Sequence, residues 1–409
     1  VTSPGLQMIT KDHMTNIEKL IKKGVQIDQP TSIEIGGDVD VDRISADGVV
    51  IYAGCKIFGP DTLILPGVKL GYEAPATVDN CQIGPDVELK GGYFNQSVFL
   101  EKAKLGMGSH VRVGTILEEQ AVIAHTVALK HTILFPFVTL GSLINFCDCL
   151  MAGGTSRKNH SEVGSSYIHF NFTPSQDKAT ASLIGDVPRG VMLNQKPIFL
   201  GGQGGLVGPC RLNFGLTVAA GTIVRKDEIR RNRLIFGREG KGGSIPFEPG
   251  RYHSNKRIIM NNIIYIGNLI ALQQWYRQVR TLFISTRFPE PLLSGLKKNI
   301  QLAIEERIER LKTVCLKTPL ETGRQKPGIS ECWPRLNETL KAHQEKKGDT
   351  ELRDKFLEYV SRSISMTNKD YIAVIQELAA KDSENGVRWL QGIVDGVTSE
   401  VQRIMPAIA

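Results

Sequence analysis

The stretch that decides the fold is residues 105–134, LGMGSHVRVGTILEEQAVIAHTVALKHTIL. An aliphatic residue stands at every sixth position, in the series Leu105, Val111, Leu117, Ile123 and Leu129. A six-residue period matches neither the 3.6-residue turn of a helix nor the two-residue alternation of a free strand. It is typical of a parallel β-helix built from hexapeptide repeats, in which three hexads, about eighteen residues, close one triangular coil.

The same period extends in both directions from this stretch. It continues, after a one-residue slip, through Leu134, Leu140 and Phe146, and it resumes over 200–224 at Leu200, Leu206, Leu212, Val218 and Val224. We therefore predict a mainly β protein with a left-handed parallel β-helix over residues 31–236. Glycine and other small residues are expected at its tight corners. A β-sandwich with coincidental spacing is the alternative, and two runs of five hits at one interval argue against it.

Other parts of the chain break the period. Residues 1–30 are expected to form an N-terminal segment with a short helix over 15–24. Three interruptions, at 71–82, 90–97 and 147–199, are predicted to leave the coil as loops, which in solenoids often lie on the binding face. Residues 237–409 are predicted to hold a linker and an α-helical domain. Helical spacing starts at Ile259, and further helices are expected over 351–363, 368–380 and 385–404. This domain is expected to cap the solenoid or to serve as a partner surface.

Composition excludes several classes of protein. The 409 residues carry 50 Lys plus Arg and 42 Asp plus Glu, and a diffuse surplus of +8 does not indicate nucleic-acid binding. The longest apolar stretch, Ile258 to Leu272, is interrupted by three asparagines, so no membrane-spanning segment is expected. The 7 cysteines are irregularly spaced, which predicts a reduced, cytoplasmic protein with no metal site.

Two cations occupy equivalent positions of adjacent coils. Arg112 and Lys130 are separated by one predicted turn of the β-helix, so their side chains should lie together on its outer face. Neighbouring cations on a rigid wall form a plausible phosphate clamp. The alternative is a pair of solvated surface charges.

Histidines are the candidate proton acceptors. His160 and His169 lie in the longest interruption, and a neutral imidazole in a cleft can take a proton from an attacking amine. Each could instead be a loop histidine bonded to the backbone. His125 and His131 are one hexad apart, on adjacent sides of a coil, which makes them poor candidates for a shared metal.

Two segments carry a resemblance to a known family. The segments FLGGQGGLVGPCRLNFGLTVAAGTIVRKD (199–227) and VRVGTILEEQAVIAHTVALKHTILFPFVTLGSLINFCD (111–148) resemble the acetyltransferase half of the bifunctional bacterial enzymes that acetylate glucosamine-1-phosphate and then uridylylate it. The resemblance covers about residues 15–230 and includes the phase slip between Ile123 and Leu134. The uridyltransferase half has no counterpart in this chain.

The resemblance implies a set of site residues. Arg112 and Lys130 fall on the family's cations for the sugar phosphate or uridylyl group, and Asn145 replaces a tyrosine of the sugar site. Residues implied to bind acetyl-coenzyme A are Asn171, Phe172, Lys178, Gly202 and Ala220. The resemblance also implies a homotrimer, because the family's sites lie between protomers.

The family's catalytic histidine aligns with Ser142, and serine cannot be the same base at neutral pH. Either His160 or His169 has taken over the role, or acetyl transfer has been lost. The function predicted first is acetyl transfer from coenzyme A to the amine of an amino sugar phosphate or sugar nucleotide. The main alternative is a non-catalytic trimeric scaffold that binds a sugar nucleotide or anion. A nucleotidyltransferase is a second alternative, but the sequence lacks the glycine-rich loop of that class.

Overall fold

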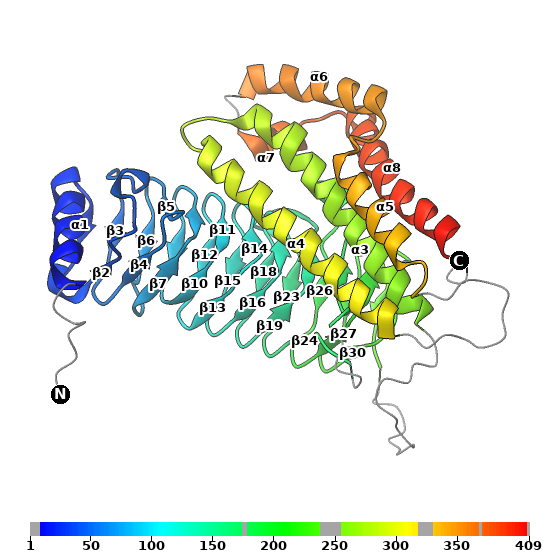
Figure 1. Ribbon diagram of the computed structural model, residues 1–409, viewed down its shortest axis with the longest axis horizontal. Helices are drawn as coiled ribbons and strands as arrows, with labels where there is room; N and C mark the ends of the chain where they lie inside the picture. Colours follow the sequence, from blue (N-terminus) through cyan, green and yellow to red (C-terminus); the bar gives the residue numbers. More distant parts are fainter. Residues whose placement is uncertain (1–8, 174–177, 238–254, 318–329, 368–369, 407–409) are drawn as a thin grey trace, which may run out of the picture. The chain divides into compact units, whose positions relative to one another are not determined.

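The computed structural model describes residues 9–173, 178–237, 255–317, 330–367 and 370–406. The chain forms two compact units: unit 1 comprises residues 1–146 and 284–299, and unit 2 comprises residues 147–283 and 300–409. Both contain coils of a parallel β-solenoid, and unit 2 also contains most of a C-terminal helical region (Figure 1). This is the fold class predicted from the six-residue period.

Unit 1 begins with α1 (Ile9–Lys23), which ends at Gly24, a glycine with a φ of 110°. The coils that follow build three faces of parallel strands. Two short 3-10 turns, η1 (Pro30–Ser32) and η2 (Val41–Arg43), join the first strands. The first face contains β1 (Gln26–Ile27), β3 (Val50–Ile51), β6 (Lys69–Leu70), β9 (Glu88–Leu89), β12 (Lys104–Leu105), β15 (Val122–Ile123) and β18 (Thr139–Leu140).

The second face of unit 1 contains β2 (Glu34–Ile35), β4 (Lys56–Phe58), β7 (Ala76–Asp79), β10 (Gly92–Asn95), β13 (Ser109–Val111) and β16 (Ala128–Lys130). The third contains β5 (Leu63–Ile64), β8 (Gln82–Ile83), β11 (Ser97–Phe99), β14 (Thr115–Leu117) and β17 (Ile133–Leu134). Strand β19 (Asn145–Cys147) begins at the end of unit 1. Strands β7 and β10 lie in segments that interrupt the six-residue count, so the coils continue through them.

The repeated apolar residues form the core of the coils. On the three faces Leu105 pairs with Ile123, Val111 with Leu129, and Leu117 with Leu134. All six side chains are buried. Each aliphatic side chain therefore stacks on its counterpart one coil away, as the sequence period requires.

Glycines with a positive φ occupy many of the corners, as expected, but not all of them. One corner of unit 1 is formed in successive coils by Gly67, Asp86, Lys102, Gln120 and Phe137, and all five have a positive φ between 56° and 75°. Only the first is glycine. A left-handed conformation costs a residue with a side chain about 1–2 kcal/mol. The ladder of hydrogen bonds above and below the corner therefore overrides the local preference.

The chain returns to unit 1 at residues 284–299, which include the start of α4 (Glu290–Lys317). Arg287 forms ion pairs with Asp86 at 2.5 Å and with Glu101 at 3.0 Å. Lys298 pairs with Asp61 at 2.6 Å. The basic partners are more than half exposed in both cases, so each pair is worth at most about 1 kcal/mol.

The solenoid strands of unit 2 also lie on three faces. They are β23 (Glu162–Val163), β26 (Phe199–Leu200), β29 (Thr217–Val218) and β31 (Leu234–Ile235); β24 (Ile168–Phe170), β27 (Gly205–Val207) and β30 (Ile223–Val224); and β20 (Cys149–Met151), β25 (Ser182–Ile184) and β28 (Arg211–Leu212). A hairpin of β21 (Gly154–Ser156) and β22 (Asn159–His160) projects from them. Residues 147–199, predicted as an inserted loop, thus supply coil strands as well as this hairpin.

The helical region of unit 2 is built around α3 (Lys256–Gln274), which is buried on nearly all sides and packs against α8 (Ala380–Ile404). The other elements are α2 (Val187–Gly190), the π-helical turn η3 (Trp275–Val279), the 3-10 turn η4 (Arg280–Phe283), the rest of α4, α5 (Trp333–Glu345), α6 (Thr350–Thr367) and α7 (Tyr371–Gln376). No helix in the described part of the chain is both long enough and apolar enough to cross a bilayer.

Asparagines join α3 to the coils of unit 2. Asn262 Nδ2 donates to the Ala179 carbonyl at 2.8 Å, and Asn268 Oδ1 accepts from the Val187 N–H at 2.9 Å. Asn261 donates to the Asp227 carboxylate at 3.0 Å. These are the three residues that interrupt the apolar stretch of the sequence. Asn262 thus binds a coil carbonyl, and Asn268 binds the first N–H of α2. Buried backbone groups need such partners.

Candidate functional site

The second face of unit 1 brings two predicted substrate-binding cations together. Val111 pairs in register with Leu129, and the Arg112 N–H donates to the Leu129 carbonyl at 2.9 Å. This register puts Arg112 directly beside Lys130 on the neighbouring strand. Because Val111 and Leu129 point into the core, the two basic side chains point outward. Both are half-buried.

Polar and aromatic side chains flank the two cations. Asn95 precedes Arg112 in the same outward row and donates to the Asp79 carboxylate at 2.9 Å. In the parallel row, Tyr93 and His110 stack with ring centroids 5.2 Å apart. The outer face of β10, β13 and β16 therefore carries cations, an amide and aromatic rings, which suits a phosphorylated polar ligand.

Asn145 belongs to the same face. The Ala128 N–H donates to the Ile144 carbonyl at 2.9 Å, which puts Asn145 beside Ala128. Its side chain is exposed, two residues along the strand from the row of Arg112 and Lys130. All three predicted substrate-binding residues thus share one outer face of unit 1.

Ser142 lies at the corner where the first face of unit 1 turns into the second. Its Oγ shares a hydrogen bond of 3.0 Å with Nδ1 of His125. The pairing of Val122 with Thr139 stacks the two residues in adjacent coils. The His125 side chain is exposed. An imidazole therefore reaches the corner occupied by Ser142.

A carboxylate lies beside this corner. Glu73 accepts a hydrogen bond from Lys90 Nζ at 3.0 Å and another from the Met107 N–H at 3.1 Å. Lys90, the Met107 N–H and, to a smaller extent, the charge of His125 lower the pKa of Glu73. Met107 stands one coil before His125, because the Thr126 N–H donates to the Met107 carbonyl at 2.9 Å. The Glu73 carboxylate thus lies close enough to His125 for their charges to interact.

The predicted base His169 lies inside the coils of unit 2. It pairs with Leu206 at an inward position and is only 2% exposed. Nδ1 donates to the Cys147 carbonyl at 2.6 Å, and Nε2 lies 2.8 Å from Ser182 Oγ. Burial lowers the pKa of this imidazole to about 4. A neutral ring with both nitrogens engaged is suited to holding coils together.

The other predicted base, His160, lies in the hairpin of unit 2. Its Nε2 is 3.6 Å from a Glu162 oxygen, and its side chain is 19% exposed. The hairpin strand β22 that carries it pairs with β21 through Gly154. Within unit 2 the structure therefore brings a carboxylate to this histidine.

The residues implied to bind acetyl-coenzyme A fall in unit 2. Gly202 and Ala220 stack at one corner, where the Gly221 N–H donates to the Gly202 carbonyl at 2.9 Å. A Cβ on Gly202 would lie 2.8 Å from the Ser165 carbonyl oxygen, so position 202 has no room for a side chain. Phe172 is 63% exposed, Asn171 is half-buried and Lys178 is exposed. The segment between them, 174–177, lies outside the described residues.

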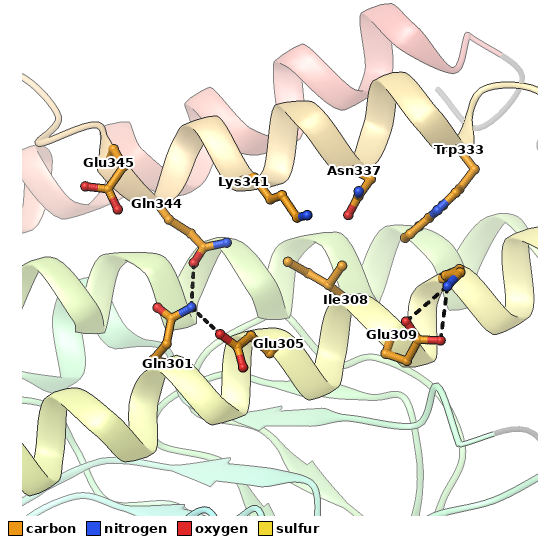
Figure 2. Close-up of a pocket in the computed structure, with 10 residues that line it drawn as sticks. Gln301, Glu305, Ile308, Glu309, Trp333, Asn337, Lys341, Gln344 and Glu345 are labelled. Carbon is orange, nitrogen blue, oxygen red and sulfur yellow. Dashed lines mark hydrogen bonds and ion pairs between the residues drawn. The ribbon is translucent and has the colours of Figure 1, made fainter.

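A separate cavity of about 460 Å³ lies between α4 and α5 of unit 2 (Figure 2). Figure 2 shows Gln301 between Glu305 and Gln344, and its Nε2 lies 2.7 Å and 3.2 Å from their oxygens. None of the predicted site residues lines this cavity, so we assign it no part in acyl transfer. Among the described residues no cluster of His, Cys, Asp or Glu is suited to a metal ion.

His125 and Glu73 also lie at the corner of Ser142, and the sequence analysis did not connect either residue with it. The signal for His125 was available, because it stands in phase with Ser142 one coil earlier. Glu73 carries no such signal, since it lies on a segment that breaks the six-residue count. Only the folded loop, whose Ala74 N–H donates to the Lys90 carbonyl at 2.9 Å, brings Glu73 to the corner.

The comparisons with known proteins agree with the fold. No protein-family model matches the chain. The bifunctional protein GlmU of Thermotoga maritima is 24% identical over 214 residues, which cover 52% of this chain and 42% of that protein. GlmU of Janthinobacterium sp. (strain Marseille) is 24% identical over 225 residues, 54% of this chain and 44% of that protein. The chain is a homologue of GlmU over about half its length.

Homology and fold together fit a hexapeptide-repeat acetyltransferase domain. GlmU of Thermotoga petrophila gives the same picture, with 24% identity over 222 residues. The chain spans less than half the length of these relatives, 42% to 44%. The resemblance seen in the sequence is thereby confirmed as homology over about half of this chain.

Proposed function

We propose that this chain transfers an acetyl group from coenzyme A to the amine of an amino sugar phosphate or sugar nucleotide. The observation that carries the proposal is the common outer face of Arg112, Lys130 and Asn145 in a homologue of GlmU. Two cations bind the phosphate, and an amide orients the sugar. The acceptor amine is then held for attack on a thioester, where positioning supplies much of the rate.

The donor in this proposal is acetyl-coenzyme A. The corner formed by Gly202 and Ala220 exposes backbone along which a pantetheine arm can lie, and Phe172 and Asn171 offer an apolar and a polar contact. Lys178 supplies a positive charge for the phosphates of the coenzyme. Backbone N–H groups aimed at the thioester oxygen would stabilise the oxyanion of the tetrahedral intermediate. In this proposal the protein is a cytoplasmic homotrimer.

One imidazole must take the proton of the attacking amine. The burial of His169, with both ring nitrogens engaged, argues for a structural role of this residue. His160 is partly accessible and lies next to Glu162, so it remains a candidate base. His125, which lies beside Ser142, is the third candidate for the base.

The experiment is a thiol-release assay with acetyl-coenzyme A and glucosamine-1-phosphate. We expect thiol release that depends on both substrates. Arg112→Ala and Lys130→Ala should each reduce this release, because they raise KM for the phosphorylated acceptor. Lys104→Ala is the matched control, because Lys104 pairs with Glu88 on the first face. No thiol release with any amino sugar phosphate would refute acetyl transfer.

A second candidate function is a non-catalytic scaffold that binds a sugar nucleotide or anion. The feature in its favour is Ser142, which the resemblance aligns with the family's catalytic histidine. Isothermal titration with glucosamine-1-phosphate separates the two functions. Binding that is lost in Arg112→Ala, together with no thiol release, would favour the scaffold over the enzyme.

A further inference from the structure

We propose that His125 is the general base of this acetyl transfer, oriented by Ser142 and assisted by the Glu73 carboxylate. This inference rests on the proposed function and assigns its proton transfer to a residue outside the sequence-predicted set. The three residues come from three coils of unit 1. Their hydrogen bonds and exposure support the role proposed for each.

Ser142 fixes the imidazole. The hydroxyl Oγ is 3.0 Å from His125 Nδ1. His125 Nε2 makes no hydrogen bond to any residue in the described part of the chain. One ring nitrogen is therefore occupied by a fixed partner and the other is available, in an exposed side chain, to meet a ligand. Triads orient their histidine by the same division of roles.

The tautomer follows from this assignment. A base at Nε2 needs its lone pair there, so Nδ1 must carry the proton and donate it to Ser142 Oγ. A serine hydroxyl accepts such a bond without itself being ionised. Ser142 is then a positioning residue, which explains why a residue that cannot itself be the base stands at this corner.

Glu73 supplies the counter-charge. Its two oxygens are held by Lys90 Nζ and by the Met107 N–H, at 3.0 Å and 3.1 Å. It is therefore a fixed carboxylate next to the coil of His125, and it stabilises the imidazolium that forms when the base takes a proton. Two other charged side chains contribute to the electrostatics here: Lys90 acts on Glu73, and Glu88 acts on Lys90.

The reaction balances with these groups alone. The amine nitrogen attacks the carbonyl carbon of the thioester and forms a C–N bond, while Nε2 of His125 takes one amine proton. The C–S bond then breaks. The imidazolium returns the proton to the leaving thiolate, so coenzyme A departs as a free thiol and His125 is regenerated.

The position agrees with the substrate face. His125 precedes β16, the strand that ends at Lys130, so the base and a phosphate-binding cation stand on one coil. Asn145 follows Ser142 by three residues, on the next coil. An acceptor held by Lys130 and Arg112 thus lies on the face onto which the His125 corner opens.

The first test compares turnover in purified full-length variants. We expect His125→Ala to lower kcat in the thiol-release assay by about 10²–10⁴-fold, with KM for acetyl-coenzyme A nearly unchanged. Added imidazole should restore part of the activity to His125→Ala. Thr126→Ala, a change at the next, exposed residue of the same corner, should retain the wild-type rate.

The outcomes separate this inference from the function on which it rests. Wild-type activity that survives in His125→Ala but disappears in His160→Ala refutes the inference and leaves acetyl transfer standing. An inactive wild type refutes both. An acetyl group found on Ser142 by mass spectrometry after incubation with acetyl-coenzyme A also refutes it, because Ser142 would then be a nucleophile.

A second test does not depend on activity. The ¹⁵N chemical shifts of the His125 ring report which nitrogen carries the proton. We expect the Nδ1–H tautomer in the wild type and a mixture of tautomers in Ser142→Ala. An Nε2–H tautomer in the wild type would overturn the assignment, whatever the assay shows. Ser142→Thr retains the hydroxyl and should retain the wild-type tautomer.

Discussion

The guanidinium of Arg307 lies 2.8 Å from the carboxylate of Asp148, and the two side chains are only 3% and 6% exposed. Arg307 comes from α4, and Asp148 stands at a coil corner with a φ of 61°. Both belong to unit 2. This pair joins the helical region of unit 2 to its coils, and both charged groups are buried away from water.

Breaking this pair should be costly. We expect Arg307→Met to lower the free energy of unfolding by about 3–5 kcal/mol, because it leaves the Asp148 charge buried without its counter-ion. The double variant Arg307→Met with Asp148→Asn should recover much of the loss. Urea denaturation followed by circular dichroism measures both. Lys355→Ala, which breaks an exposed pair with Glu351, should lower the free energy of unfolding far less.

His169 should make stability depend on pH. Its pKa of about 4, lowered mainly by burial, lies below the ordinary value of 6.5. Between these two values the unfolded chain binds a proton here and the folded chain does not, so stability falls as pH falls. We expect wild type to lose up to about 3 kcal/mol more than His169→Gln between pH 7 and pH 4. Parallel urea-denaturation curves for the two proteins would contradict this.

The cation pair should govern affinity for a phosphate-bearing acceptor. We expect Arg112→Ala to raise the Kd for glucosamine-1-phosphate by about 10- to 100-fold, because a charge-assisted hydrogen bond is lost. The effect should shrink as salt rises, since the interaction lies on an outer face. Isothermal titration at two ionic strengths is the measurement. Equal affinities of wild type and Arg112→Ala would exclude this face as the phosphate site.

Asn268 should be more important to stability than its polarity suggests. Replacing it with leucine leaves the Val187 N–H buried without an acceptor, which costs about 1–3 kcal/mol. Thermal unfolding of Asn268→Leu against wild type measures this loss. Asn337→Ala on α5, whose side chain lines the open cavity, serves as the control and should change stability by less than about 0.5 kcal/mol.

The coils were predictable because each apolar residue makes its defining contact one coil, that is three hexads, away. Leu105, Val111 and Leu117 each pair with the residue that the count assigns. The proximity of Arg112 and Lys130 follows from the same count of residues per coil. Fold class and the cation face therefore need only the sequence period and the alternation of strand faces.

Other features depend on contacts that no local pattern encodes. In the sequence, Asn261, Asn262 and Asn268 interrupt an apolar helix, and only the folded unit shows which atoms of other segments they bind. His169 was expected on a loop, whereas it occupies an inward coil position because Cys147 and Ser182 satisfy both of its nitrogens. Glu73 reaches its corner only through tertiary hydrogen bonds.

The corner formed by Lys90, Met107, His125 and Ser142 uses one residue from each of four successive coils. In a solenoid each coil contacts only its neighbours, so whole turns can be gained or lost without unfolding the rest. Such length changes are neutral for this corner when they fall before the coil of Glu73. Within the span from Glu73 to Ser142, the duplication or deletion of a single turn would separate the hydroxyl, the imidazole and the carboxylate while leaving every hexad intact.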